Sequence, residues 1–217
     1  MISFKSFFRW GVLLLQFCTA VSALRCLKKN VSIEWKILIA VWVLTFLVEA
    51  AGKILGVFLK INNHILYNIY FIVFFNGLIY FYYRTLHAKA WKKISLVLLI
   101  SYNVITVYLF FKIGIKSLYS YSFSAGGSIV IILGIAYFIK LYKDEVAFIS
   151  LRGDPVYWIS LGLILYFAGQ VPMIGMYNLL VKKSMSFINQ YIFYFGNFIT
   201  VVLHFFLIKG FTVKRNE

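Results

Sequence analysis

Residues 35–59 read WKILIAVWVLTFLVEAAGKILGVFL, and this stretch decides the fold. Apart from Lys36 near its start, its charged residues are Glu49 and Lys53. A helix crosses a bilayer with about 20 mainly apolar residues. The stretch is therefore long enough to span a membrane as one helix, and it carries two ionisable groups where such groups are costly.

Six further apolar windows lie on either side of this stretch, and the composition agrees with them. Of the 217 residues, 63% are hydrophobic and 13% are charged, whereas soluble domains are about 45–50% apolar and about 25% charged. A water-soluble fold is excluded. We expect an all-α bundle of seven transmembrane helices that forms a single domain over residues 1–217. The predicted spans are about 7–25, 35–59, 64–83, 94–111, 122–142, 156–180 and 188–210.

The formal net charge is +16, from 22 Lys and Arg residues against 6 Asp and Glu residues. The cations form short clusters between the apolar windows. This pattern is typical of membrane-protein loops that contact anionic lipid headgroups. The bilayer is therefore the expected partner, and nucleic acid is not.

The distribution of the cations predicts the orientation of the chain. One set of connections carries fourteen cations and the opposite set carries eight. The positive-inside rule then predicts a multi-pass protein of the plasma (inner) membrane, with the N-terminus outside and the C-terminus in the cytoplasm. The first apolar run resembles a secretory signal, but Arg25, Lys28 and Lys29 after it outnumber the cations before it. We therefore expect a retained helix.

Glu49 and Lys53 are the leading candidates for a ligand site. They lie one turn apart on the second predicted helix, in the order that suits a helical ion pair. Two interpretations remain open: Lys53 extends to the interface and neutralises Glu49, or the pair belongs to a ligand or ion site, because ionisable groups inside a membrane usually have a function.

Polar side chains also line one face of two other predicted helices. Their usual role is to form interhelical hydrogen bonds, and we expect that role for Asn76 and His204. Asn68 and Asn189 lie at the depth of Lys53, where a pocket is favoured. The two stripes are His64, Asn68, Asn76 and Tyr80, and Asn189, Asn197, Thr200 and His204.

The sixth predicted helix carries Gly169 and Pro172, which predict a hinge because proline disrupts the helical hydrogen bonds around it. Gln170 between them lies at about the depth of Glu49. We expect an outward-facing polar cavity, with Gln16 at its lower end. Its predicted ligand-binding residues are Glu49, Lys53, Asn68, Gln170, Asn189 and Asn197.

Local signals mark the helix ends at the predicted cytoplasmic side. Asp154 and Pro155 predict an N-cap followed by a first-turn proline. Tyrosines 80, 82 and 83 are expected in an aromatic belt at the interface. Residues 140–155 form the longest cytoplasmic connection, and its mixed charges suit the docking of a protein partner. The docking residues that we expect are Lys143, Asp144, Glu145 and Arg152.

Catalytic and cofactor signatures are absent from the sequence. We find no His-Glu-x-x-His, no glycine-rich phosphate loop, no Gly-x-Ser-x-Gly and no cysteine pair at zinc spacing. The histidines, at positions 64, 87 and 204, lie on different predicted elements. No cofactor, metal site or catalytic residue is expected, and a non-enzymatic role is favoured although an enzymatic one is not excluded.

The motifs of rhodopsins, G-protein-coupled receptors and PQ-loop carriers are not present in the sequence. The last helix has no mid-span lysine for retinal, Arg84 follows Tyr83 without the acidic residue of G-protein-coupled receptors, and Gln170-Val171-Pro172 is not the Pro-Gln motif of PQ-loop carriers. The chain most resembles small uncharacterised bacterial seven-helix integral membrane proteins, in hydropathy and in stretches such as INNHILY at residues 61–67. That resemblance implies no activity.

The hypothesis that these observations favour is a receptor or sensor with an outer polar cavity for a small-molecule ligand. Without a cytosolic domain, such a protein would signal through a separate cytoplasmic or membrane partner. One alternative is a small transporter or channel that uses Glu49 as its ion or proton site. Another is an oligomeric membrane effector without its own ligand, and the oligomeric state is left open.

Overall fold

The computed structural model describes residues 4–27, 31–115, 117–144, 151–175 and 186–213. Side chains are described from Trp10 in the first helix and from Phe193 in the last one. Seven long helices occupy the described chain, and a short π-helix, η1, extends the second of them. Their bounds are α1 Phe4–Cys26, α2 Ile33–Lys53, η1 Ile54–Phe58, α3 His64–Thr85, α4 Lys89–Ile113, α5 Ser120–Lys143, α7 Pro155–Gly175 and α9 Ser186–Thr212.

These helices confirm the predicted class, an all-α bundle of a polytopic membrane protein. Six of them are long and apolar enough to cross a bilayer, and the part of α1 whose side chains are described, Trp10–Cys26, is a shorter apolar helix. The helix bounds follow the predicted spans within a few residues. Residues 176–180 of the sixth predicted span lie outside the described residues. Which end of the bundle faces the cytoplasm stays a prediction.

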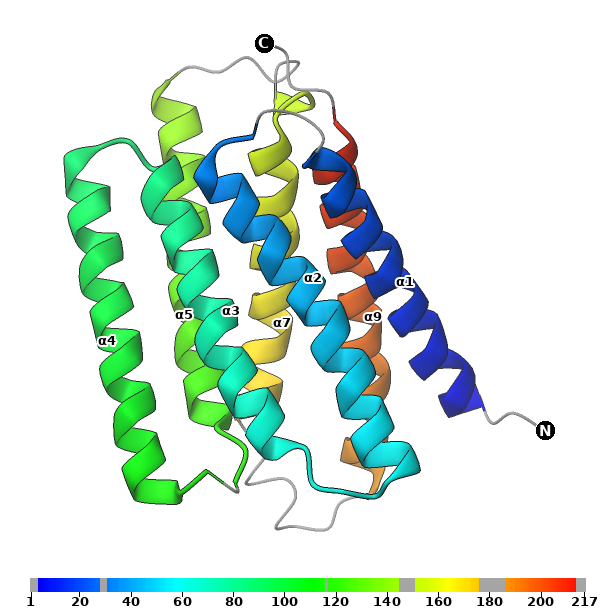
Figure 1. Cartoon of the computed structure of the whole chain (residues 1–217). Coiled ribbons are helices and arrows are strands. Elements are labelled where there is room, and N and C mark those ends of the chain that lie inside the picture. Colours follow the sequence, from blue (N-terminus) through cyan, green and yellow to red (C-terminus); the bar gives the residue numbers. More distant parts are fainter. Residues whose placement is uncertain (1–3, 28–30, 116, 145–150, 176–185, 214–217) are drawn as a thin grey trace.

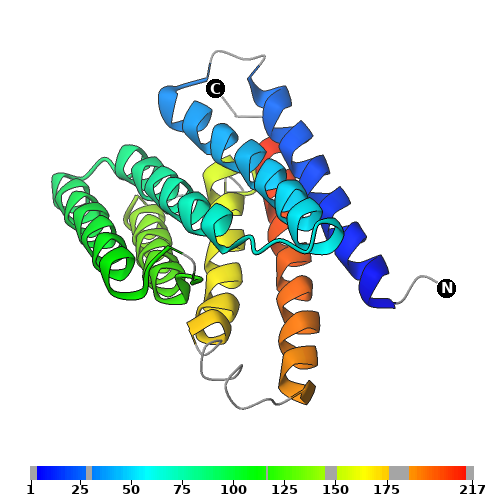
Figure 2. The same ribbon diagram turned by 60° about the horizontal axis from the view of Figure 1, so that its bottom comes forward.

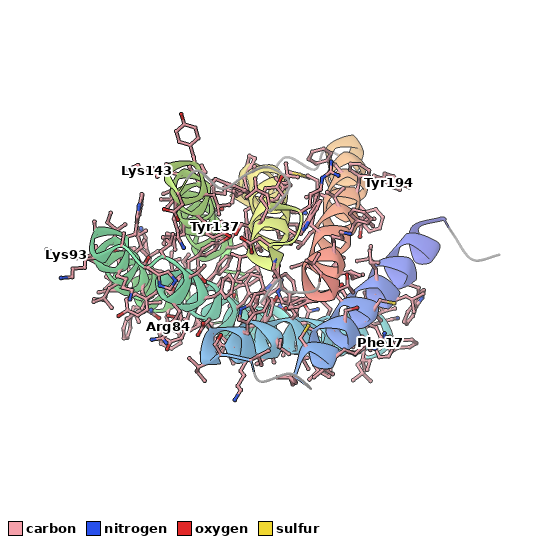
Figure 3. All side chains as sticks on the ribbon, turned by 90° about the horizontal axis from the view of Figure 1, so that it is seen from above. Phe17, Arg84, Lys93, Tyr137, Lys143 and Tyr194 are labelled. Atoms are coloured by element: carbon pink, nitrogen blue, oxygen red, sulfur yellow. The ribbon has the colours of Figure 1, made fainter. Side chains whose placement is uncertain are left out.

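The helices form two layers when the bundle is seen along its axis (Figure 3). One layer contains α4, α3, α2 and α1 in that order, and the other contains α5, α7 and α9. Contacts between α1 and α9 and between α3 and α5 join the layers. Six helices therefore form a closed ring, while α4 lies outside it against α3 and α5 (Figure 2).

The start of α1 and the end of α9 lie at opposite ends of the bundle (Figure 1). We name the two ends by a residue at each. The Asn63 end holds connections 59–63 and 114–119, and the Asp154 end holds connections 86–88 and 151–154. The cation count predicts that the Asp154 end is cytoplasmic.

Aromatic rings fill the centre of the bundle between α3, α5 and α7. The Phe75 ring lies 5.5 Å from that of Phe167 and 5.6 Å from that of Phe123, measured between ring centroids. Two glycines of α5 allow this approach, because a Cβ atom on Gly126 would meet the Phe75 ring and one on Gly127 would lie 2.8 Å from Phe167. Small residues at such contacts are typical of membrane helices, which associate through close packing.

Interhelical hydrogen bonds confirm the roles expected for Asn76 and His204. Asn76 and Asn103 each donate an amide hydrogen bond to the other, at 3.1 and 2.8 Å, and so join α3 to α4. The ring of His204 shares a 2.9 Å hydrogen bond with Thr19, which joins α9 to α1. The aromatic-belt prediction is wrong for Tyr82, whose side chain is buried and donates to Ser160 Oγ at 3.0 Å.

The start of α7 also follows its prediction. The helix begins at Pro155, and Asp154 Oδ1 accepts a 2.8 Å hydrogen bond from the backbone N–H of Val156. The other carboxylate oxygen accepts a hydrogen bond from the hydroxyl of Tyr137 on α5. Asp154 thus caps its own helix and joins it to a neighbour.

Candidate functional site

A cavity of about 480 Å³ lies inside the helix ring and runs from the Asn63 end to the middle of the bundle. Small-molecule sites have volumes of roughly 300–1,000 Å³. Its wall combines aromatic rings with a few polar groups. The described lining residues are Gln16, Trp42, Thr45, Glu49, Asn63, His64, Tyr67, Tyr70, Phe71, Phe74, Leu118, Phe123, Tyr166, Gln170, Ile174, Thr200, Leu203 and His204.

Helix α2 contributes a polar stripe to this wall. Trp42, Thr45 and Glu49 line the cavity, and their spacing of three and four residues places them on one helix face. Glu49 Oε2 accepts a hydrogen bond from the Tyr67 hydroxyl at 3.4 Å, and Thr45 Oγ1 lies 2.9 Å from the Tyr70 hydroxyl oxygen. The one carboxylate of the described wall is thus held against α3.

The mouth of the cavity is built where α2 meets the start of α3. Asn63 Nδ2 donates a 3.0 Å hydrogen bond to the carbonyl oxygen of Gly52 and ties the connection to α2. Gly52 also faces the ring of Tyr67, because a Cβ atom at this position would lie 2.6 Å from the Tyr67 hydroxyl oxygen. Glycine at position 52 therefore allows Tyr67 to reach Glu49.

Helices α1, α7 and α9 close the opposite wall. Gln170 Nε2 donates a 3.1 Å hydrogen bond to the carbonyl oxygen of Gly196, which joins α7 to α9. Deeper in the cavity, the rings of His204 and Trp42 meet edge to face, with 6.0 Å between their centroids. His204 is 2% exposed and bonds Thr19 on α1. The deepest part of the cavity is therefore formed jointly by α1, α2 and α9.

Two polar atoms at this depth have no hydrogen-bond partner among the described residues. They are Gln16 Oε1, an acceptor, and Trp42 Nε1, a donor. Their side chains are only 6% and 2% exposed and both line the cavity. Buried polar groups in proteins are nearly always hydrogen-bonded, either to other protein groups or to ordered water, so these two atoms are available to a molecule that occupies the cavity.

The cavity ends at an apolar floor. On the Asp154 side of Trp42 and His204, four helices of the ring contribute apolar side chains that are at most 1% exposed. These floor residues are Leu38 and Ile39 on α2, Leu78 and Ile79 on α3, Leu163 on α7 and Leu207 on α9. The described lining of the cavity does not extend past Trp42 and His204 to these residues.

No family model, curated protein or solved structure matches the chain. The resemblance to small bacterial seven-helix proteins is confirmed only as an architecture, a multi-helix bundle with membrane-spanning helices. In the part of the chain that the structure describes, no cluster of three His, Cys, Asp or Glu residues could hold a metal ion.

The structure places two of the six predicted ligand residues, Glu49 and Gln170, in the cavity wall. Lys53 is half-buried and lies outside the described lining, although its charge acts on the Glu49 carboxylate. Asn197 also lies outside the described lining and donates to the carbonyl oxygen of Phe193 in its own helix at 2.6 Å. The side chain of Asn189 falls outside the described residues.

Asn68 has a different use from the one we expected. Its Nδ2 donates to the carbonyl oxygens of Ile115 and Ser117, at 3.1 and 2.8 Å, and its Oδ1 accepts from the backbone N–H of Tyr119 at 2.9 Å. The amide thereby fastens the connection between α4 and α5 to α3. Asn68 is 2% exposed and lies outside the described cavity lining.

Sequence reasoning missed most of the aromatic wall. Trp42 and Thr45 precede Glu49 by seven and four residues, so the helical period could have assigned them to the same face. Tyr166 likewise lies one turn before Gln170. No comparable local signal distinguishes Tyr67 and Tyr70 from the other aromatic residues of α3.

The predicted hinge and docking residues have the following places. A Cβ atom on Gly169 would meet Ile199 of α9, so this glycine has a packing role. Pro172 lies inside α7, which continues to Gly175.

Of the predicted docking residues, Lys143, Asp144 and Arg152 are exposed at the Asp154 end, and Glu145 lies outside the described residues. Hinge motion and partner docking stay predictions.

Proposed function

We propose that this membrane protein is a receptor or sensor that binds a small molecule in the cavity and signals through a separate partner at the Asp154 end. The observation that carries this proposal is the unpartnered pair, Gln16 Oε1 and Trp42 Nε1, deep in a pocket of ligand size. A bound molecule with hydrogen-bonding groups would satisfy both atoms.

The apolar floor residues support binding rather than passage through the bundle. A channel needs a polar path between the two faces, whereas the floor residues on the Asp154 side of Trp42 and His204 are apolar and buried. A receptor needs only one opening. The exposed charges of Lys143, Asp144 and Arg152 lie at the opposite end, where a partner could respond to ligand binding.

A small transporter is the second candidate, and one observation favours it. Pro172 lies on α7, the helix that contributes Tyr166, Gln170 and Ile174 to the cavity wall. A bend at a proline would move that wall relative to Glu49. In this alternative Glu49 is the ion or proton site, and the floor opens during the transport cycle.

Cysteine accessibility tests whether the cavity is a water-filled binding site. In a background where Cys18 and Cys26 are replaced by serine, Thr45→Cys should react with a neutral, water-soluble maleimide applied at the Asn63 end. Leu47→Cys is the matched control, because Leu47 is two residues away and 54% exposed on the outer surface of the bundle. Equal protection of both thiols would contradict an open cavity and hence the proposed function.

A proton-flux assay separates the receptor from the transporter. Liposomes containing the purified protein are given a pH gradient and a membrane potential, and a pH-sensitive dye is enclosed. A receptor should leave the flux at the level of protein-free liposomes. Flux above that level that is lost in Glu49→Gln would favour the transporter.

A further inference from the structure

We infer that the ligand of this cavity is an organic cation, an ammonium group on an apolar body that ends in a hydroxyl or amide group. The inference rests on the proposed function and specifies the chemistry of its ligand. It follows from the charge of the wall, the aromatic rings around that charge and the two unpartnered atoms at the deep end.

The charge of the wall favours a cation. Among the described lining residues Glu49 is the one acidic residue, and neither Lys nor Arg is present. A carboxylate removed from water needs a charged or strongly hydrogen-bonding partner, and the Tyr67 hydroxyl supplies one bond at 3.4 Å. A ligand ammonium would place a positive charge beside the carboxylate, which a neutral molecule cannot do.

The rings near Glu49 add a second attraction for a cation. Tyr67, Tyr70 and Tyr166 line the cavity together with Glu49, and the Tyr67 hydroxyl group contacts its carboxylate. Aromatic faces attract ammonium groups, and aromatic cages around quaternary ammonium ions are a recurrent recognition mode. An anion would instead meet the like charge of the Glu49 carboxylate.

The deep end of the cavity specifies the far end of the ligand. Gln16 Oε1 needs a donor and Trp42 Nε1 needs an acceptor. One hydroxyl group provides both, as does an amide. Trp42 and Glu49 are seven residues apart, about 10 Å along a helix axis, so the ligand is elongated, with its ammonium near the mouth and its neutral polar group at the floor.

Lys53 provides an internal competitor for this cation. It lies one turn from Glu49 and its charge acts on the same carboxylate, while the residue itself lies outside the described lining. A ligand ammonium must therefore compete with Lys53 for Glu49. Replacing Lys53 by methionine should strengthen ammonium binding, the opposite of the effect of Glu49→Gln.

The test uses three matched probes with the purified full-length protein in nanodiscs. They are (6-hydroxyhexyl)trimethylammonium, its neutral carbon isostere 7,7-dimethyloctan-1-ol, and hexyltrimethylammonium, which lacks the hydroxyl group. Dissociation constants are measured by calorimetric titration, with protein-free nanodiscs subtracted. The hydroxylated ammonium should bind at least about tenfold more tightly than each of the other two, because each loses one strong polar contact.

Variants assign the two contacts. Glu49→Gln should weaken the hydroxylated ammonium by about tenfold and leave the neutral alcohol unchanged, and Trp42→Phe should reduce the advantage of the hydroxyl group. Glu34→Gln is the matched control, because this carboxylate lies at the Asp154 end, 3.8 Å from Arg84. It should change neither constant. Since the comparison of probes needs only the wild-type protein, misfolding of a variant does not weaken the test.

The outcomes separate this inference from the proposed function. Equal or tighter binding of the neutral alcohol would overturn the cation while leaving the cavity as a ligand site. No binding of the hydroxylated ammonium above the nanodisc background would overturn the inference outright. In that case the labelling of Thr45→Cys still decides whether the cavity is a water-filled pocket, so the proposed function is judged independently.

Discussion

The hydroxyl group of Tyr67 donates a hydrogen bond to the carboxylate of Glu49, with 3.4 Å between the two oxygens. This contact joins α2 to α3 at the wall of the cavity. It depends on Gly52, one turn from Glu49, because any side chain at position 52 would occupy the space of the Tyr67 hydroxyl group. The orientation of the Glu49 carboxylate is thus linked to Gly52, although Gly52 is not among the described residues that line the cavity.

We predict that Gly52→Ala displaces the Tyr67 ring and destabilises the protein by about 1–3 kcal/mol, the usual cost of overpacking. Unfolding in SDS-containing mixed micelles, followed by circular dichroism, measures this free energy. Gly56→Ala is the matched control, because its Cβ atom would lie 3.4 Å from Asn63 Nδ2, at ordinary contact distance. Equal destabilisation by both variants would contradict the specific role of Gly52.

Asn68→Ala should destabilise the protein by about 2–3 kcal/mol, because it leaves two carbonyl oxygens and one N–H of the 115–119 segment without their partner. Hydrogen exchange at the Tyr119 amide should accelerate in the same variant. Asn197→Ala removes only a hydrogen bond within its own helix and should cost less than about 1 kcal/mol. If the Tyr119 amide stayed protected in Asn68→Ala, the fastening role would be wrong.

The Asn76 and Asn103 amides should be energetically coupled. Each donates to the other and also to a carbonyl oxygen of its own helix, Asn76 to Ile72 and Asn103 to Leu99, both at 2.8 Å. A double-mutant cycle with alanine at both positions should give a coupling energy of about 1 kcal/mol. Strictly additive effects of the two substitutions would mean that the pair contributes nothing between α3 and α4.

Asp154→Ala should cost about 1–2 kcal/mol, because it removes the N-cap of α7 and the acceptor for the Tyr137 hydroxyl group. Asp154→Asn keeps a capping oxygen and should recover most of that loss. Tyr137→Phe isolates the contact with α5. Hydrogen exchange at the Val156 amide distinguishes the two effects, since only loss of the cap should accelerate it.

The cation distribution predicts that the Asp154 end is cytoplasmic. Reporter fusions after residues 90 and 217 should both give cytoplasmic signals, with green fluorescent protein active and alkaline phosphatase inactive. A fusion after residue 61, at the Asn63 end, should give the reverse pattern. A periplasmic signal at residue 90 or 217 would contradict the predicted orientation, and with it the outward opening of the cavity.

The sequence by itself determined the features that depend on nearby residues. Runs of about 20 apolar residues predicted the helices, and the pair Asp154 and Pro155 predicted the start of α7 from a cap that acts within one turn. It also predicted that Asn76 and His204 would bond across helices, because a buried polar group in a membrane needs a partner. The sequence did not indicate which helix supplies that partner.

Only the tertiary structure decided how the helices face one another. Nearly all helix surfaces in this chain are apolar, so hydropathy does not distinguish a face against lipid from one against another helix. The order of the ring depends on close packing, as where Gly126 admits the ring of Phe75. With the helices in this order, Asn68 binds the connection between α4 and α5, and Trp42 lines the cavity. The ligand site was therefore only partly predictable, since side chains far apart in the sequence build its wall.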